Sequence, residues 1–151
     1  MGYWELAWGE LALRRGETSD AIERLERGLE LTSADSLIDF YLGSESLATA
    51  WQQLGNETQA LRVLEDAAHV KARYLPYGLV GAGAFGRFRV QAGLAREYRR
   101  LEHIDEAEAL EADVLRMLAY ADADHPIVRQ IRESQASRAA FLGESHATAT
   151  H

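Results

Sequence analysis

The sequence predicts an all-α fold built from antiparallel helix pairs. Ala, Leu, Glu and Arg are abundant, β-branched residues are sparse, and Pro76 and Pro126 are the only prolines, a composition that favours helix along nearly the whole chain. Apolar residues recur at steps of three and four, which places them on one face of a helix. A short helix–turn–helix corner also returns along the chain, which indicates an internal repeat.

We expect the first helix pair at about residues 3–15 and 18–31. Gly16 lies where the first helix ends and a residue that tolerates a positive φ is needed. Thr18 or Ser19 can cap the N-terminus of the second helix. The apolar face of this second helix consists of Ala21, Ile22, Leu25 and Leu29.

The corner recurs twice downstream. Gly55 opens a second copy, which predicts helices at about 35–54 and 57–72, and Leu101 to Glu106 form a third corner that lacks the glycine. The third pair is expected at about 77–101 and 104–121. The repeats therefore cover about 3–34, 35–74 and 75–121, and they are longer than the standard unit of 34 residues. Equivalent alanines in the three copies are Ala21, Ala60 and Ala107.

The C-terminal part predicts one more helix, at about 126–141. Pro126 suits its first turn, because a fixed φ and a missing N–H donor cost nothing there. We expect this capping helix to cover the apolar end of the stack. The domain then spans 1–141, and residues 142–151, which have no apolar periodicity, are expected to form a flexible tail.

The stretch from Gly16 to Leu31 resembles the second helix of a tetratricopeptide repeat together with its turn. The family pattern also has small residues where helices cross and aromatic residues around them, although Val114 departs from it. The positions that fit are Ala21 and Gly28, Ala60 and Ala67, Ala48 and Trp51, and Ala95 and Tyr98. Over about residues 3 to 120, the resemblance implies an α-solenoid of about three helix pairs. It also implies a scaffold that binds a protein partner in its concave groove.

A second, softer resemblance runs from Phe40 to Ile127. This stretch is similar to the C-terminal repeat regions of bacterial serine/threonine kinases and related signalling proteins. The chain has no kinase core, so the likeness implies at most an accessory module. The alternative function is therefore a regulatory or dimerisation module of a larger bacterial signalling protein.

Charge and composition restrict the partners. With 24 acidic and 16 basic residues the net charge is −8, which disfavours binding to nucleic acid or to an anionic membrane surface. The absence of cysteine excludes disulfides and thiolate metal ligands. Neither an apolar run of about 18 residues nor a signal-peptide pattern occurs. We therefore expect a soluble, cytoplasmic protein that binds neither nucleic acid nor a membrane.

No motif predicts catalysis. The run from Gly81 to Gly86 fits the dinucleotide pattern G-x-G-x-x-G, but no buried strand precedes it, and close helix packing is the better interpretation. The histidines are dispersed, without the spacing of metal ligands. Glu108 and Glu111 share a helix face, which we interpret as solvated surface. We expect no cofactor, no metal and no enzyme activity.

The residues most suggestive of binding are the arginines of the third pair's first helix. Helical spacing predicts that Arg89, Arg96 and Arg100 share one broad stripe with Arg99 beside it. They either bind an acidic or C-terminal-carboxylate peptide or pair with the chain's own Glu and Asp residues, and both remain open. The resemblance adds further groove positions to these four arginines: Leu42, Glu45, Thr49, Gln52 and Gln53 in repeat two, and Tyr3, Leu6, Glu10 and Leu13 in repeat one.

Three aromatic residues, Tyr3, Trp4 and Trp8, lie near the N-terminus. They are either core for the first pair or an exposed apolar face. In the second case, a homodimer through this N-terminal aromatic face is a reasonable expectation.

Overall fold

The chain is all-α, as predicted. The computed structural model describes residues 1–32, 36–69 and 80–148, with the side chains of 80–84 and 138–148 left aside, and the described residues form seven helices and no strand. The helices are α1 Gly2–Arg14, α2 Thr18–Leu31, α3 Leu37–Gln53, α4 Glu57–His69, α5 Val80–Arg100, α6 Ile104–Met117 and α7 Pro126–Thr148. The starts predicted for α2, α4 and α6 are confirmed. The parts of the predicted helices at 70–72 and 77–79 lie outside the described residues.

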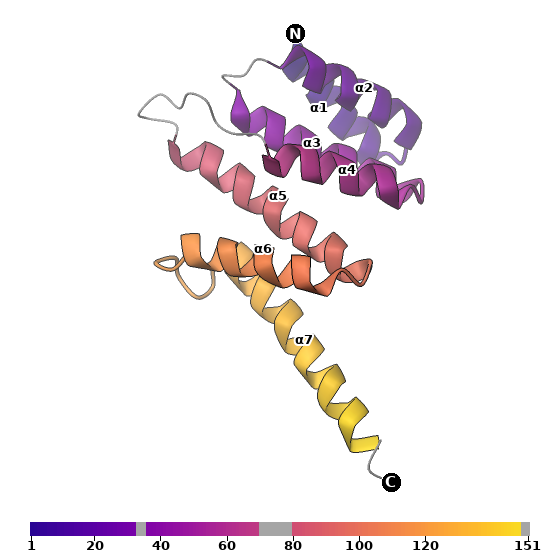
Figure 1. Cartoon of the computed structure of the whole chain (residues 1–151). Helices are drawn as coiled ribbons and strands as arrows, with labels where there is room; N and C mark the ends of the chain where they lie inside the picture. Colours follow the sequence, from indigo (N-terminus) through magenta and orange to yellow (C-terminus); the bar gives the residue numbers. More distant parts are fainter. Residues whose placement is uncertain (33–35, 70–79, 149–151) are drawn as a thin grey trace.

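The helices follow one another down the molecule in chain order (Figure 1). The extensive contacts are within the pairs α1 with α2, α3 with α4, and α5 with α6. Successive pairs also touch, since α3 packs on α1 and α2, and α5 packs on α3 and α4. The N-terminus lies at one end of the described part of the molecule and the end of α7 at the other (Figure 1).

The three corners have the same backbone hydrogen bonds. The amides of Glu17, Asn56 and His103 donate to carbonyls five residues earlier, at 3.0, 2.9 and 2.8 Å, which is the Schellman arrangement at a helix C-terminus. Gly16 and Gly55 have the left-handed φ values this needs, 77° and 72°. In the third corner Glu102 adopts φ 64° instead, so the missing glycine does not alter the turn.

The predicted side-chain cap of the second helix is wrong. The N-cap residue is Glu17, which makes no capping hydrogen bond, and Thr18 is already helical. The Thr18 hydroxyl instead donates to the side-chain oxygen of Gln53 at 3.2 Å. The helix begins at this point because the preceding turn fixes the chain direction, without help from a cap.

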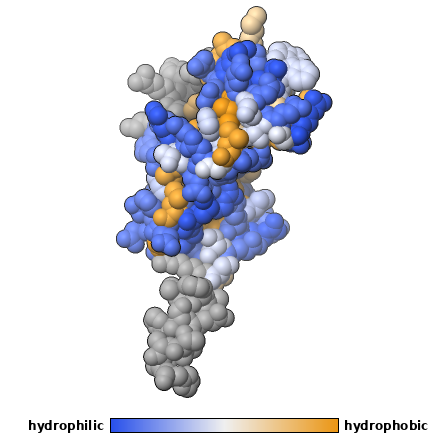
Figure 2. All heavy atoms as spheres, turned by 90° about the vertical axis from the view of Figure 1, so that its right-hand side faces the viewer, coloured by the Kyte–Doolittle hydropathy of each residue, from blue (hydrophilic) through white to orange (hydrophobic). Residues whose placement is uncertain are grey.

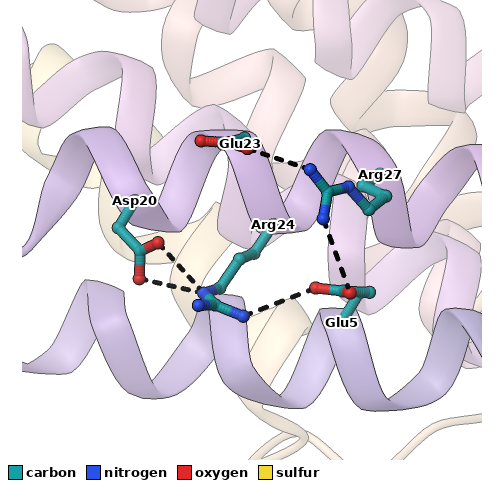
Figure 3. Close-up of polar contacts among 5 residues, drawn as sticks. All are labelled: Glu5, Asp20, Glu23, Arg24 and Arg27. Atoms are coloured by element: carbon teal, nitrogen blue, oxygen red, sulfur yellow. Dashed lines mark hydrogen bonds and ion pairs between the residues drawn. The ribbon is translucent and has the colours of Figure 1, made fainter.

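Helices α1 and α2 approach closely and run antiparallel. A Cβ added to Gly9 would lie 2.7 Å from Leu25, and one added to Gly28 would lie 2.9 Å from the backbone nitrogen of Leu6. Ion pairs also join the two helices, because Glu5 of α1 faces Arg24 at 3.6 Å and Arg27 at 3.9 Å (Figure 3). Small residues at the contact are thus a steric requirement of this pair.

The core forms three clusters along the stack. The first lies between α1, α2 and α3, and the second between α3, α4 and α5; half-buried Trp51 and Val63 pack against both. The third is smaller and contains Ala92, Val114, Ile127 and Ile131. Ala21, Ala60 and Ala107, the equivalent alanines of the three repeats, are all fully buried.

The C-terminal prediction is wrong in its boundary. Helix α7 does not stop at 141 but continues to Thr148, into the segment 142–151 that was expected to be a tail. No proline interrupts this segment, and extending an existing helix costs little per residue. Among the described side chains of α7, Ile127 and Ile131 pack on the third core cluster and Gln135 bonds to Glu111 of α6, and beyond this part the helix projects away from the other helices (Figure 1).

Candidate functional site

A hollow of about 520 Å³ lies between α1 and α3. Its apolar lining includes Tyr3 and Leu42, which are 61% and 41% exposed. Its polar lining includes Ser46, whose hydroxyl donates to Glu10 at 2.6 Å and so joins the two helices. We call this space the α1–α3 hollow.

A second hollow, of about 340 Å³, lies between α5 and the start of α7. Phe85, Pro126 and Ile127 form its apolar lining, and Arg96 and Gln130 are among its polar residues. We call this space the α5–α7 hollow. It combines an apolar surface with a guanidinium group, as sites for mixed apolar and charged ligands do.

The two hollows share Glu45 of α3 and Arg89 of α5. These side chains form an ion pair of 2.7 Å and are 31% and 40% exposed. The α1–α3 hollow, this ion pair and the α5–α7 hollow together form what we call the groove. Its walls come from α1, α3 and α5 with the start of α7.

Most groove positions implied by the resemblance do line these hollows. The α1–α3 hollow contains Tyr3, Leu6, Glu10, Leu13, Leu42, Glu45, Thr49 and Arg89, and the α5–α7 hollow adds Arg96. Gln52 and Gln53 border neither hollow. They lie at the end of α3, beside the corner, where Gln53 contacts Thr18 of α2.

Two of the four arginines predicted for the groove, Arg99 and Arg100, do not line it. Arg99 points between α5 and α6, where it makes two hydrogen bonds to Glu111 of 2.7 and 2.6 Å. Arg100 turns toward α4 and pairs with Glu57, and it also reaches Glu97 at 2.9 Å. These bonds raise the pKa of both guanidinium groups. Of the four arginines, only Arg89 and Arg96 line the groove.

Arg96 is the least satisfied of these arginines. Its side chain is 60% exposed, and its ion-pair contact is Glu97 at 3.9 Å. Glu97 already accepts the shorter bond from Arg100. The guanidinium of Arg96 thus keeps most of its hydrogen-bonding capacity for a ligand.

Glu111 is buried, which contradicts its interpretation as solvated surface. Its side chain is 2% exposed and also accepts a 2.9 Å hydrogen bond from Gln135 of α7. Counted from the turn, Glu111 has the position of Leu25 and Leu64, which are both buried. Aligning the three corners on their turn residues would have identified a carboxylate at a core position.

The glycine run belongs to a helix. Residues 81–86 lie inside α5, so they do not form a phosphate-binding loop, and a Cβ on Gly86 would lie 3.0 Å from Tyr41. The packing interpretation is thereby confirmed at Gly86. Among the described residues no cluster of His, Asp and Glu could hold a metal ion, and none of the described helices is long and apolar enough to cross a membrane.

The exposed apolar surface is divided. Figure 2 shows a mostly hydrophilic face, with hydrophobic side chains in narrow strips. Trp4 and Trp8 of α1 are 66% and 52% exposed, so they do not belong to the core of the first pair. This decides the alternative left open at the N-terminus in favour of an exposed aromatic face.

Comparisons with protein-family models, with curated proteins and with solved structures find no match for this chain. The helices and the two hollows define the class on their own: an all-α protein of successive helix pairs with an open groove. The tetratricopeptide resemblance stays a prediction.

Proposed function

We propose that this chain is a protein-interaction scaffold that binds a segment of a partner protein in the groove. The observation that carries the proposal is the pair of hollows joined through Glu45 and Arg89, with Tyr3, Leu42 and Phe85 partly exposed in their walls. Large apolar side chains beside charged groups favour recognition of a peptide segment. The proposal includes a tetratricopeptide-like α-solenoid, in which α1, α3 and α5 line the concave side.

Capture from a native lysate of the source organism tests the proposal. Leu42→Arg places a bulky charge in the α1–α3 hollow, and we expect it to abolish capture of a partner that the unmodified protein retains. Leu54→Arg is the matched control, because Leu54 is similarly exposed, at 51%, beside the second corner. Both variants should show unchanged helicity by circular dichroism. Equal capture by both variants would contradict binding in the groove.

A second candidate is homodimerisation through the aromatic face of α1, as in a regulatory module of a larger signalling protein. The exposure of Trp4 and Trp8 favours it. Sedimentation equilibrium of the unmodified protein and of Trp4→Ser/Trp8→Ser tests whether the protein is a homodimer through this face or a monomer. A dimer that the double substitution converts to monomer supports this function, and a monomer in both excludes it.

A further inference from the structure

The α1–α3 hollow carries an excess of negative charge. Its charged residues are Glu10, Arg14, Asp39, Glu45 and Arg89. Glu10 pairs with Arg14 at 3.1 Å, and Glu45 pairs with Arg89 at 2.7 Å. Asp39 remains, and the partner that the described residues give it is the uncharged hydroxyl of Ser36. The unbalanced charge at this end of the groove is therefore a carboxylate.

The α5–α7 hollow carries the opposite excess. Its charged residues are Glu45, Arg89 and Arg96. Once Glu45 and Arg89 neutralise each other, Arg96 supplies the remaining charge of the lining. Its ion-pair contact, Glu97 at 3.9 Å, is shared with Arg100, which lies closer to it at 2.9 Å. Phe85, which is 43% exposed, and Ile127 provide an apolar surface in the same hollow. A carboxylate beside an apolar side chain matches this chemistry.

We infer that the groove is bipolar and selects a partner segment with two opposite charges. A basic side chain binds in the α1–α3 hollow beside Asp39, and a carboxylate next to an apolar side chain binds in the α5–α7 hollow at Arg96. The inference rests on the proposed function and specifies its ligand. It narrows the acidic or C-terminal-carboxylate peptide suggested by the sequence, because Arg99 and Arg100 are held by Glu111 and Glu57 outside the groove and only Arg96 is left to bind a carboxylate.

The charge pattern fixes the direction of the bound segment. A segment in the reverse direction would bring its carboxylate to Asp39 and its basic group to Arg96, and like charges in contact oppose binding. The Glu45–Arg89 ion pair separates the two ends. Direction is thus set by electrostatics, while the apolar walls of the two hollows accept varied sequences.

The test uses two small probes on the ¹⁵N-labelled full chain. N-acetyl-leucine presents a carboxylate beside an apolar side chain, and N-acetyl-lysine methylamide carries only an ammonium charge. We expect N-acetyl-leucine to shift the amide resonances of Phe85 and Ile127, and the shifts to be lost in Arg96→Gln. N-acetyl-lysine methylamide should shift those of Ala7 and Leu42, with loss in Asp39→Asn.

The control variants come from α4. Arg62→Gln and Asp66→Asn remove an exposed pair 3.9 Å apart that lies outside both hollows, and they should leave all probe shifts unchanged. Both probes binding at one end, or shifts that survive Arg96→Gln and Asp39→Asn, would overturn the inference. If the inference is overturned, the lysate experiment still decides the proposed function. Loss of the partner in Leu42→Arg would support binding in the groove, and retention of the partner in Leu42→Arg would refute it.

Discussion

Glu102 shows how a single residue adopts the conformation its corner requires. It is a non-glycine residue at φ 64°, in a turn whose other copies contain Gly16 and Gly55. A side chain in the left-handed region costs about 1–2 kcal/mol. The Schellman hydrogen bonds, including the 2.8 Å bond from His103 to Tyr98, hold it there.

Glu102→Gly is therefore expected to stabilise the protein by about 1 kcal/mol, because glycine removes most of that backbone cost. The measurement is the free energy of unfolding in urea. Gly16→Ala is the control. No atom lies within 4 Å of the added Cβ, so its expected loss of about 1 kcal/mol is purely conformational. A destabilised Glu102→Gly variant would show that the Glu102 side chain makes a compensating contact.

Tyr98 provides a pH-dependent readout of the contact between α5 and α4. Burial, and then its 2.9 Å hydrogen bond to Glu65, raise its pKa to about 12. The ordinary value is about 10, so the phenol is protonated more readily in the folded protein than in the unfolded chain. The protonated Tyr98 phenol therefore contributes its full stabilisation of the folded state below about pH 10, and this stabilisation is lost as the pH rises toward 12.

We expect Tyr98→Phe to remove an ionisation near pH 12 from a spectrophotometric titration of the folded protein, whereas the contribution of Tyr41, whose pKa burial also raises, is retained. The variant should also lose less stability than the unmodified protein between about pH 10 and 12. Tyr120 supplies the control, since it is fully exposed, and Tyr120→Phe should leave the late ionisation intact. A titration without a late component in the unmodified protein would contradict the role of Glu65.

At the scale of elements, Arg99 and Glu111 replace an apolar contact with an ion pair. Relative to the turn they have the positions of Leu13 and Leu25 in the first pair, which are both buried. Their side chains are 12% and 2% exposed. Removing one member of such a buried pair leaves an uncompensated charge, while replacing both with apolar residues is often neutral or stabilising.

Glu111→Leu alone is expected to cost about 3 kcal/mol, and Arg99→Leu/Glu111→Leu should recover most of the loss. A double-mutant cycle in urea measures the coupling. Arg116→Leu/Asp113→Leu is the matched control, since that pair on α6 is exposed at 77% and 57% and should contribute about 0.5 kcal/mol or less. If the losses in free energy of unfolding from Arg99→Leu and Glu111→Leu simply add in the double variant, the two residues do not form a coupled ion pair.

The sequence predicted elements better than it predicted orientation. The starts of α2, α4 and α6 follow from the corners, because a turn is determined by the residues within it. The direction of Arg99 depends on which neighbour each face of α5 meets, and helical spacing alone does not contain that information. Glu111 was misjudged for a different reason: its face was judged from the spacing within one helix, whereas its place relative to the turn, shared with buried Leu25 and Leu64, marks a core position. The end of α7 was missed because a lack of apolar periodicity says little about a helix that projects from the stack.

At the scale of the whole molecule, stability should be unequal along the stack. The first two core clusters are joined by Trp51 and Val63, whereas the third is smaller and shares α5 with its neighbour. Among the described side chains of α7, Ile127 and Ile131 near its start belong to this third cluster. Fewer buried apolar contacts mean a lower free energy of local opening.

Native-state hydrogen exchange is therefore expected to show α6 and α7 opening at a lower free energy than α2 to α4. Trp51→Ala should lower the opening free energy of α1 and α2 by about 1–3 kcal/mol, because it removes the side chain that joins two clusters. Trp8→Ala should change little, since Trp8 is 52% exposed and is not part of the first core cluster. Identical opening free energies in all helices would indicate a single cooperative unit instead.

The ion pair between Glu45 and Arg89 has one more consequence. Because both residues border both hollows, a ligand group that draws Arg89 toward one hollow changes the charge that Glu45 presents to the other. The two ends of the groove are then linked thermodynamically. Under the proposed binding mode, reciprocity requires that occupancy of the Arg96 end changes the affinity at the Asp39 end by the same factor as the reverse, so the two charges of the proposed segment would not bind independently.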